Sequence, residues 1–95
     1  MSDYYTACEL ALLWSLRDLE RTTTKQWFGT REVAYRIPLE TKYELGVAGL
    51  SDLSMASKIL HKMKRRKLVV HSGGTMNDWE LGEIGRKVAE RINIE

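Results

Sequence analysis

The sequence predicts a mainly α-helical domain with one small β-hairpin, in the order helix, helix, helix, hairpin, helix. Apolar residues recur at helical spacing in four separate segments. A short β-branched stretch and an alternating stretch lie on either side of a glycine pair at 73 and 74. The length of 95 residues suits one hydrophobic core, so we expect residues 1–95 to form a single domain.

The first helix is predicted from Asp3 to about Arg21. Thr6 and Glu9 stand three residues apart, which is the spacing of a capping box at a helix start. An apolar stripe follows this start at steps of three and four residues. Its members are Tyr5, Cys8, Leu12, Leu16 and Leu19.

Leu10, Leu13 and Trp14 place further apolar area on other faces of this helix. A single amphipathic helix in so small a domain needs only one apolar face. Two interpretations therefore stand. The helix is central and buried on several sides, or these three residues form the interface of a homodimer.

The middle of the chain predicts a second helix and then a long loop. After a connection with one short extended piece, Thr30 is the expected N-cap of a helix from Arg31 to Ile37, which Pro38 ends. Two glycines and a lack of sustained periodicity follow. We therefore expect Pro38 to Leu50 to be a loop with one helical turn around Thr41 to Leu45.

The third helix is predicted over about residues 52–66. Ser51 and Asp52 offer two adjacent N-caps. The apolar face of this helix comprises Leu53, Ala56, Ile59, Leu60 and Met63. The opposite face has small hydroxyls near its start and cations further on, in the order Ser54, Ser57, Lys58, His61, Lys62 and Arg65.

A β-hairpin with a glycine tip is predicted over about residues 68–81. Residues 68–71 are rich in β-branched side chains, residues 72–75 are typical of a turn, and residues 78–81 alternate polar and apolar side chains. Gly82 precedes the final helix, which is predicted from Glu83 to about Ile94. Its apolar face comprises Ile84, Val88, Ala89 and Ile92.

Composition excludes several classes of protein. The chain is 43% hydrophobic and 29% charged, and no apolar run approaches the roughly 20 residues that span a bilayer. The run from Leu10 to Leu16 lacks the features of a secretory signal, so we expect a cytoplasmic protein. Cys8 is the only cysteine, and with the distant His61 and His71 it predicts no metal site. We expect no cofactor.

The charge of the chain is strongly segregated. The net charge is only +2, but residues 53–77 contain six Lys and Arg and no Asp or Glu, whereas the rest holds 13 acidic and 9 basic residues. The block therefore carries +6 on a body of −4. Such a block repels itself unless an anionic partner relieves the repulsion, so nucleic acid is the expected partner class.

Two segments carry a resemblance to a known family, namely residues 54–69, SMASKILHKMKRRKLV, and residues 79–86, WELGEIGR. The first resembles the recognition helix of the winged helix-turn-helix family and its run into the first wing strand. The second resembles the second wing strand and the start of the last helix. The similarity is to regulators of the multiple-antibiotic-resistance and phenolic-acid-regulator type. It implies sequence-specific binding of double-stranded DNA by a transcriptional regulator. The family usually has glycine, in a left-handed conformation, where Lys67 stands, so Lys67 implies either mild strain there or a different exit of the chain from the helix.

The third helix suits the major groove of B-DNA, which is roughly 12 Å wide. Small polar residues in its first half permit close approach to base edges, while later cations can meet phosphates. We therefore expect Ser54, Ser57 and Lys58 to contact bases, with His61 and Lys62 beside them. The residues expected near the phosphates are Lys64, Arg65, Arg66, Lys67 and Arg31.

The hairpin tip completes the predicted interface. The resemblance implies that this wing lies against the minor groove or adjacent phosphates, which brings Thr75 and Asn77 into the set of DNA-binding residues. The tip is slim and uncharged, so we expect it to contribute less than a wing that carries Arg or Lys. A homodimer would place two third helices on half-sites about 10 base pairs apart.

Two other functions compete with this hypothesis. A winged-helix module could bind an acidic protein surface through the hairpin and the third helix. A non-specific architectural or replication protein would bind DNA without reading its sequence. We expect no enzymatic activity, because the sequence shows no nucleophile with its base, no metal cluster and no phosphate loop.

Overall fold

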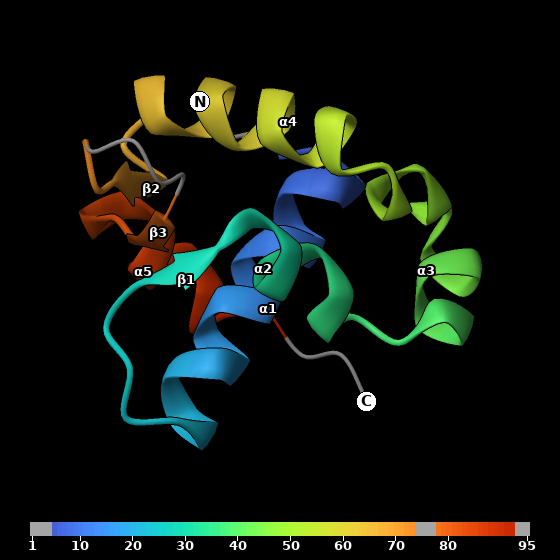
Figure 1. Ribbon diagram of the computed structural model, residues 1–95, viewed down its shortest axis with the longest axis horizontal. Coiled ribbons are helices and arrows are strands. Elements are labelled where there is room, and N and C mark those ends of the chain that lie inside the picture. Colours follow the sequence, from blue (N-terminus) through green and yellow to red (C-terminus); the bar gives the residue numbers. More distant parts are fainter. Residues whose placement is uncertain (1–4, 74–77, 93–95) are drawn as a thin grey trace.

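The computed structural model describes residues 5–73 and 78–92, in which helices surround a small antiparallel sheet (Figure 1). The predicted class, mainly α with a small hairpin, is confirmed. The helices are α1 (Ala7–Thr22), α2 (Thr30–Arg36), α3 (Leu39–Leu45), the 3₁₀ helix η1 (Ala48–Ser51), α4 (Leu53–Arg65) and α5 (Glu83–Ala89). The strands are β1 (Phe28–Gly29), β2 (Val69–His71) and β3 (Asp78–Leu81).

Helix α1 begins with the predicted capping box. The Glu9 backbone N–H donates to Thr6 Oγ1 at 3.1 Å, and the Thr6 N–H donates to Glu9 Oε1 at 2.9 Å. The helix therefore begins at Ala7 rather than at Asp3. Its C-terminal end at Thr22 agrees with the prediction to within one residue.

Helix α1 is the centre of the fold and contacts α2, α4, α5 and β3. Leu13 is fully buried within the single chain, so its assignment to a dimer interface is wrong. Leu10 and Trp14 are half-buried. The central-helix interpretation accounts for the extra apolar residues, since a helix packed on several sides needs more than one apolar face.

Helix α2 starts one residue earlier than predicted. Gly29, not Thr30, is its N-cap, and the Gly29 N–H donates to Glu32 Oε1 at 3.0 Å. Thr30 is the first helical residue, and its hydroxyl accepts a hydrogen bond from Trp79 Nε1 at 2.9 Å. Pro38 follows the end of α2, as the sequence predicts.

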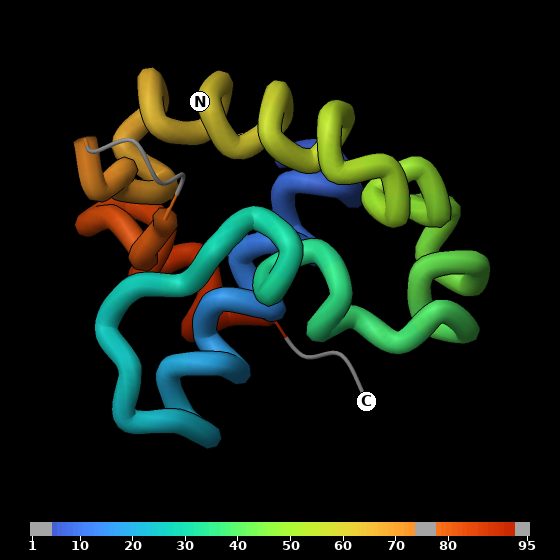
Figure 2. Tube along the Cα trace, viewed as in Figure 1, coloured from blue at the N-terminus to red at the C-terminus, as the bar shows by residue number. Residues whose placement is uncertain are grey.

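The stretch from Pro38 to Leu50 holds more helix than predicted, because the helical turn expected around Thr41 to Leu45 is the two-turn helix α3 and η1 follows it. Helix α3 buries Lys42, which is 3% exposed, and exposes Leu39 and Tyr43. The Lys42 ammonium donates to Ser51 Oγ at 3.3 Å, and burial lowers the pKa of this lysine. Gly46 ends α3 with a left-handed φ of 75°, and the chain turns back through η1 to α4 (Figure 2).

The sheet has the strand order β1, β3, β2, and both pairs are antiparallel. The predicted hairpin is present, with Val70 opposite Glu80. The short extended piece expected before α2 is β1, which places Phe28 opposite Trp79. Thr75 and Asn77 of the predicted tip lie outside the described residues.

Helix α5 ends at Ala89, earlier than the predicted end at Ile94, which lies outside the described residues. Its apolar face also differs, because Gly85 and Ala89 are buried while Ile84 is exposed. A Cβ atom at Gly85 would lie 1.8 Å from the carbonyl oxygen of Leu68. Glycine at this position therefore allows α5 to cross the start of the hairpin closely.

Candidate nucleic-acid interface

Helix α4 lies along one side of the molecule, with its inner face on the core and its outer face open (Figure 1). Asp52 is the N-cap, and its carboxylate accepts the Ser54 N–H at 2.9 Å. The other candidate cap, Ser51, belongs to η1. The inner face is anchored by the fully buried Ala56, Leu60 and Met63.

The outer face carries four exposed residues that we call the α4 stripe: Ser54, Lys58, Lys62 and Arg65. They follow one another at steps of four, four and three residues, so they lie in one line along the helix. Within residues 5–73 and 78–92, none of the three cations of the stripe forms an ion pair.

Several cations elsewhere in the chain are neutralised by carboxylates. Arg36 pairs with Asp18, and Arg86 pairs with Glu20 at 2.8 Å. The α4 stripe differs from these, because it presents positive charge to solvent from one helix face. Such a surface attracts a polyanion.

Ser57 and His61 lie to one side of the stripe and are half-buried. The His61 ring is 5.4 Å from the His71 ring and 4.9 Å from the Trp79 ring, measured between centroids, so it packs α4 against the hairpin. Burial first, and then the positive charges of nearby His71, Lys64 and Arg65, lower the pKa of His61.

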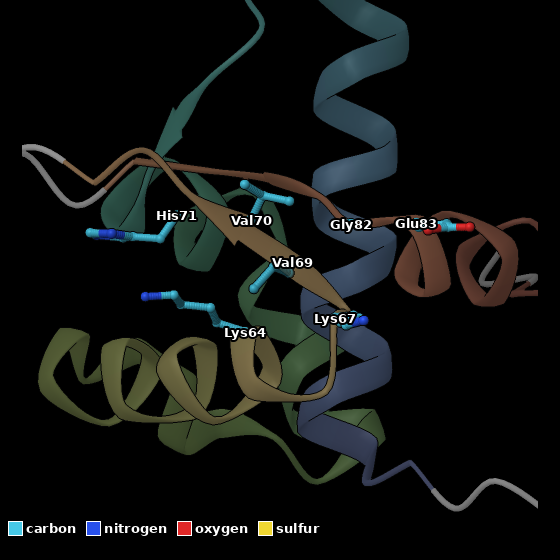
Figure 3. A pocket seen from close by; sticks show the side chains of 7 residues that line it. All are labelled: Lys64, Lys67, Val69, Val70, His71, Gly82 and Glu83. Carbon is cyan, nitrogen blue, oxygen red and sulfur yellow. The ribbon is translucent and has the colours of Figure 1, made fainter.

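A pocket of about 350 Å³ lies between the C-terminal end of α4, strand β2 and the start of α5 (Figure 3). Lys64 and Lys67 both line it, so the structure brings together two of the predicted phosphate-binding residues. The side chains of Lys64 and His71 extend in the same direction (Figure 3). Glu83 also lines the pocket, and the Lys64 side chain extends away from Lys67 (Figure 3), so each lysine offers a phosphate group a separate point charge.

Of the two alternatives for Lys67, the structure has the strained one, because its backbone is left-handed, with φ 62°. The Leu68 N–H donates to the Met63 carbonyl at 3.0 Å, and the Lys67 N–H donates to the Lys64 carbonyl at 3.0 Å. This pair of hydrogen bonds is the Schellman motif, in which glycine is the preferred residue at the left-handed position. The chain therefore leaves α4 through a Schellman motif that has lysine in place of the usual glycine.

Arg66 lies on the opposite side of the stripe, toward α1. Its Nη1 donates to Glu9 Oε2 at 2.9 Å, and its guanidinium is 5.0 Å from the centre of the Tyr5 ring. Arg66 therefore links α4 to the start of α1. Its predicted phosphate contact stays a prediction, and any substitution there also removes this link.

The predicted phosphate residue outside α4 is Arg31. It is exposed in the first turn of α2, and its guanidinium lies 5.3 Å from the centre of the Tyr35 ring. Because α2 packs against α4, Arg31 is on an element that borders the proposed interface.

Sequence reasoning missed Met55 as a site residue. Its side chain is 45% exposed, whereas Leu60 and Met63 of the same helix are buried. Met55 lies three residues before Lys58 and seven before Lys62, so the three side chains are neighbours on the helix surface. The helical spacing alone could have shown that Met55 is off the core face.

Comparisons with family models, curated proteins and solved structures find no significant match to this chain. In the part of the chain that the structure describes, no cluster of three or more His, Cys, Asp or Glu could hold a metal ion. No helix of the described residues is both long and apolar enough to cross a membrane. The charge and geometry of α4 and its surroundings are therefore the features of this chain that point to a function.

Proposed function

We propose that this chain is a winged helix-turn-helix protein that binds double-stranded DNA sequence-specifically as a transcriptional regulator. In this proposal α4 is the recognition helix and the β2–β3 hairpin is the wing. The observation that carries the proposal is the α4 stripe, a line of exposed residues on one helix face whose three cations form no ion pair within the part of the chain that the structure describes.

The shape of α4 supports binding in the major groove. An α-helix with its side chains is about 10–12 Å across, which matches a groove roughly 12 Å wide. Ser54 stands at the N-terminal end of the stripe, where recognition helices contact base edges. Lys58, one turn further on, can reach the acceptor atoms of guanine.

The C-terminal end of α4 supports contacts to phosphates. Arg65 is exposed at the end of the stripe, and Lys64 and Lys67 line the pocket beside β2. These three cations lie within four residues of one another at the end of the helix. A DNA strand that leaves the groove there would meet them, which adds affinity without reading sequence.

We also propose a homodimer, because two copies would place two recognition helices on half-sites about 10 base pairs apart. Leu13 takes no part in this contact, since it is buried within one chain. A dimer with twofold symmetry requires a palindromic binding site.

A selection from a random pool of duplexes tests both proposals. The full chain is used to enrich bound duplexes over several rounds, in parallel with Lys58→Ala and with Lys87→Ala, a control that removes an exposed lysine on α5. We expect the unmodified chain and Lys87→Ala to enrich the same palindromic motif, and Lys58→Ala to enrich it weakly. Binding without any enriched motif contradicts sequence-specific recognition, and a single unrepeated motif contradicts the dimer.

A further inference from the structure

Met55 is a large apolar side chain exposed on the same side of α4 as the cations of the stripe. It is 45% exposed and lies within one helical turn of Lys58. It is placed in the first turn of α4, the half of a recognition helix that reaches base edges. An apolar side chain in this position gains nothing from solvent, so it is suited to an apolar group on the bound partner.

The backbone of η1 keeps Met55 in place. A Cβ atom at Gly49 would lie only 2.8 Å from Met55 Sδ, so the thioether rests directly over this glycine. Any larger residue at 49 would displace the methionine. The Met55 thioether therefore packs against the turn that precedes α4, and the part of the residue that this turn leaves uncovered is available to a partner.

The charges around Met55 narrow the choice of partner. Lys58 and Lys62 are its neighbours on the helix surface and neither is ion-paired within the described residues. A second copy of the same surface would bring lysines against lysines, which is unfavourable. The partner must therefore be anionic and must also present a small apolar group.

Duplex DNA presents one such group in the major groove, the 5-methyl group of thymine. We propose that Met55 contacts a thymine methyl and makes this chain select a thymine at that position of its site. The inference rests on the proposed binding of duplex DNA by α4. It adds an apolar contact to the polar contacts of Ser54 and Lys58, and it distinguishes thymine from uracil and cytosine by the methyl group alone.

The test replaces thymine by uracil in the duplex that the random pool selects. Uracil pairs as thymine does and lacks only the methyl group. Fluorescence anisotropy with the full chain should show binding to the thymine duplex about fourfold tighter than to its uracil copy, the factor that corresponds to about 0.8 kcal/mol for one buried methyl group. Each thymine is then replaced singly to find the position responsible.

Two variants identify Met55 as the residue responsible. Met55→Ala should bind the thymine and uracil duplexes equally, whereas Leu39→Ala, which removes an exposed apolar side chain on α3, should keep the fourfold difference. Thermal melting by circular dichroism checks that both variants are folded. Equal binding of both duplexes by the unmodified chain overturns the inference while leaving DNA binding intact, as does a preference for thymine that survives in Met55→Ala. Failure of the unmodified chain to bind any duplex instead overturns the proposed function.

Discussion

Lys67 occupies a backbone conformation that suits glycine better than lysine. Its φ of 62° brings the Cβ atom close to the carbonyl oxygen, which costs a non-glycine residue about 1–2 kcal/mol. Replacing Lys67 by glycine removes this strain. Part of the stability gained in this way is lost again, because glycine has more backbone entropy in the unfolded chain. We expect Lys67→Gly to raise the free energy of unfolding by about 0.5–1 kcal/mol, measured by urea denaturation.

The control for this prediction is the same substitution within α4. Lys62→Gly places glycine in an exposed helix interior and should lower the free energy of unfolding by about 1 kcal/mol. Changes of opposite sign in the free energy of unfolding at the two positions would identify the left-handed backbone at Lys67 as the cause of the stabilisation there. A loss of stability in Lys67→Gly would contradict it.

His61 makes the stability of the fold depend on pH. Burial, followed by the positive charges of His71, Lys64 and Arg65, lowers its pKa below the ordinary 6.5. Near this pH the unfolded chain then binds more protons than the folded chain, so the free energy of unfolding rises with pH. The contribution of neutral His61 is fully present above pH 6.5 and is lost as the pH falls below that value.

Urea denaturation between about pH 5 and about pH 8 measures this dependence. His61→Gln keeps a polar side chain of similar size and removes the titrating group. We expect the stability of the unmodified chain to fall more steeply toward acid than that of His61→Gln. Parallel curves would show that His61 does not carry the effect.

At the scale of elements, the close contact of α5 with the start of the hairpin is possible because Gly85 has no side chain. A Cβ atom at Gly85 would lie 1.8 Å from the Leu68 carbonyl oxygen and 3.0 Å from Leu13 Cδ2. We expect Gly85→Ala to lower the free energy of unfolding by about 3 kcal/mol, since backbone must move to make room. Thermal or urea denaturation measures the loss.

Gly29→Ala is the matched control, because a Cβ atom at Gly29 would make only ordinary contacts of 3.7 and 3.8 Å with side-chain oxygens. Its cost should stay below about 1 kcal/mol, the effect of alanine at a helix N-cap. Equal losses in the two variants would contradict the close approach of α5.

The adjacent residues Arg65 and Arg66 have different roles, because only Arg66 links α4 to α1. Arg66 pairs with Glu9, a residue that is only 8% exposed and whose carboxylate also belongs to the capping box of α1. Arg65 is exposed on the stripe. We expect Arg66→Ala to lower the free energy of unfolding by about 1–2 kcal/mol because it leaves a buried carboxylate oxygen without this partner.

Arg65→Ala should change the free energy of unfolding by less than about 0.5 kcal/mol, as most exposed substitutions do. The two variants remove the same charge from neighbouring positions, so chemical denaturation compares them directly. Equal stability of both variants would show that the pair with Glu9 does not hold α4 on α1.

The elements that the sequence predicted well are those whose apolar residues face the core at regular spacing. Helices α1 and α4 and the alternation of Trp79 and Leu81 belong to this group. Helix α3 was predicted only as a single turn, because its pattern is the reverse of an amphipathic helix: it buries Lys42 and exposes Leu39 and Tyr43. Its glycine at position 46, taken as a sign of a loop, is the helix end.

For the whole molecule, the sequence alone predicted the cationic helix but not how its charges are divided. The spacing of Ser54, Lys58 and Lys62 was enough to place them on one face. The separation of Arg66 from this face depends on Glu9, which is 57 residues away in sequence. The burial of Leu13 likewise depends on the approach of α5 at Gly85, and a local pattern contains neither contact.

The positions of Lys58 and Arg65 on α4 allow the loss of a base contact to be distinguished from the loss of a phosphate contact in DNA binding. Lys58 stands one turn from the start of the stripe, in the half of α4 that is proposed to reach base edges, whereas Arg65 stands at its end beside the pocket lined by Lys64 and Lys67. A base contact adds affinity only on the right sequence, but a phosphate contact adds it on every sequence. Arg65 is the better residue at which to test a phosphate contact, because Arg66 also pairs with Glu9 and so contributes to the stability of the fold.

The most direct test of the central claim is a fluorescence-anisotropy titration of Lys58→Ala and Arg65→Ala at several salt concentrations, on the selected duplex and on a scrambled one. Lys58→Ala should lose about 1–3 kcal/mol on the selected duplex and much less on the scrambled one. Arg65→Ala should weaken binding to both duplexes alike and reduce the slope of log affinity against log salt by about one. If both variants weaken binding to both duplexes by the same factor, α4 contributes only positive charge to DNA binding and does not read the DNA sequence.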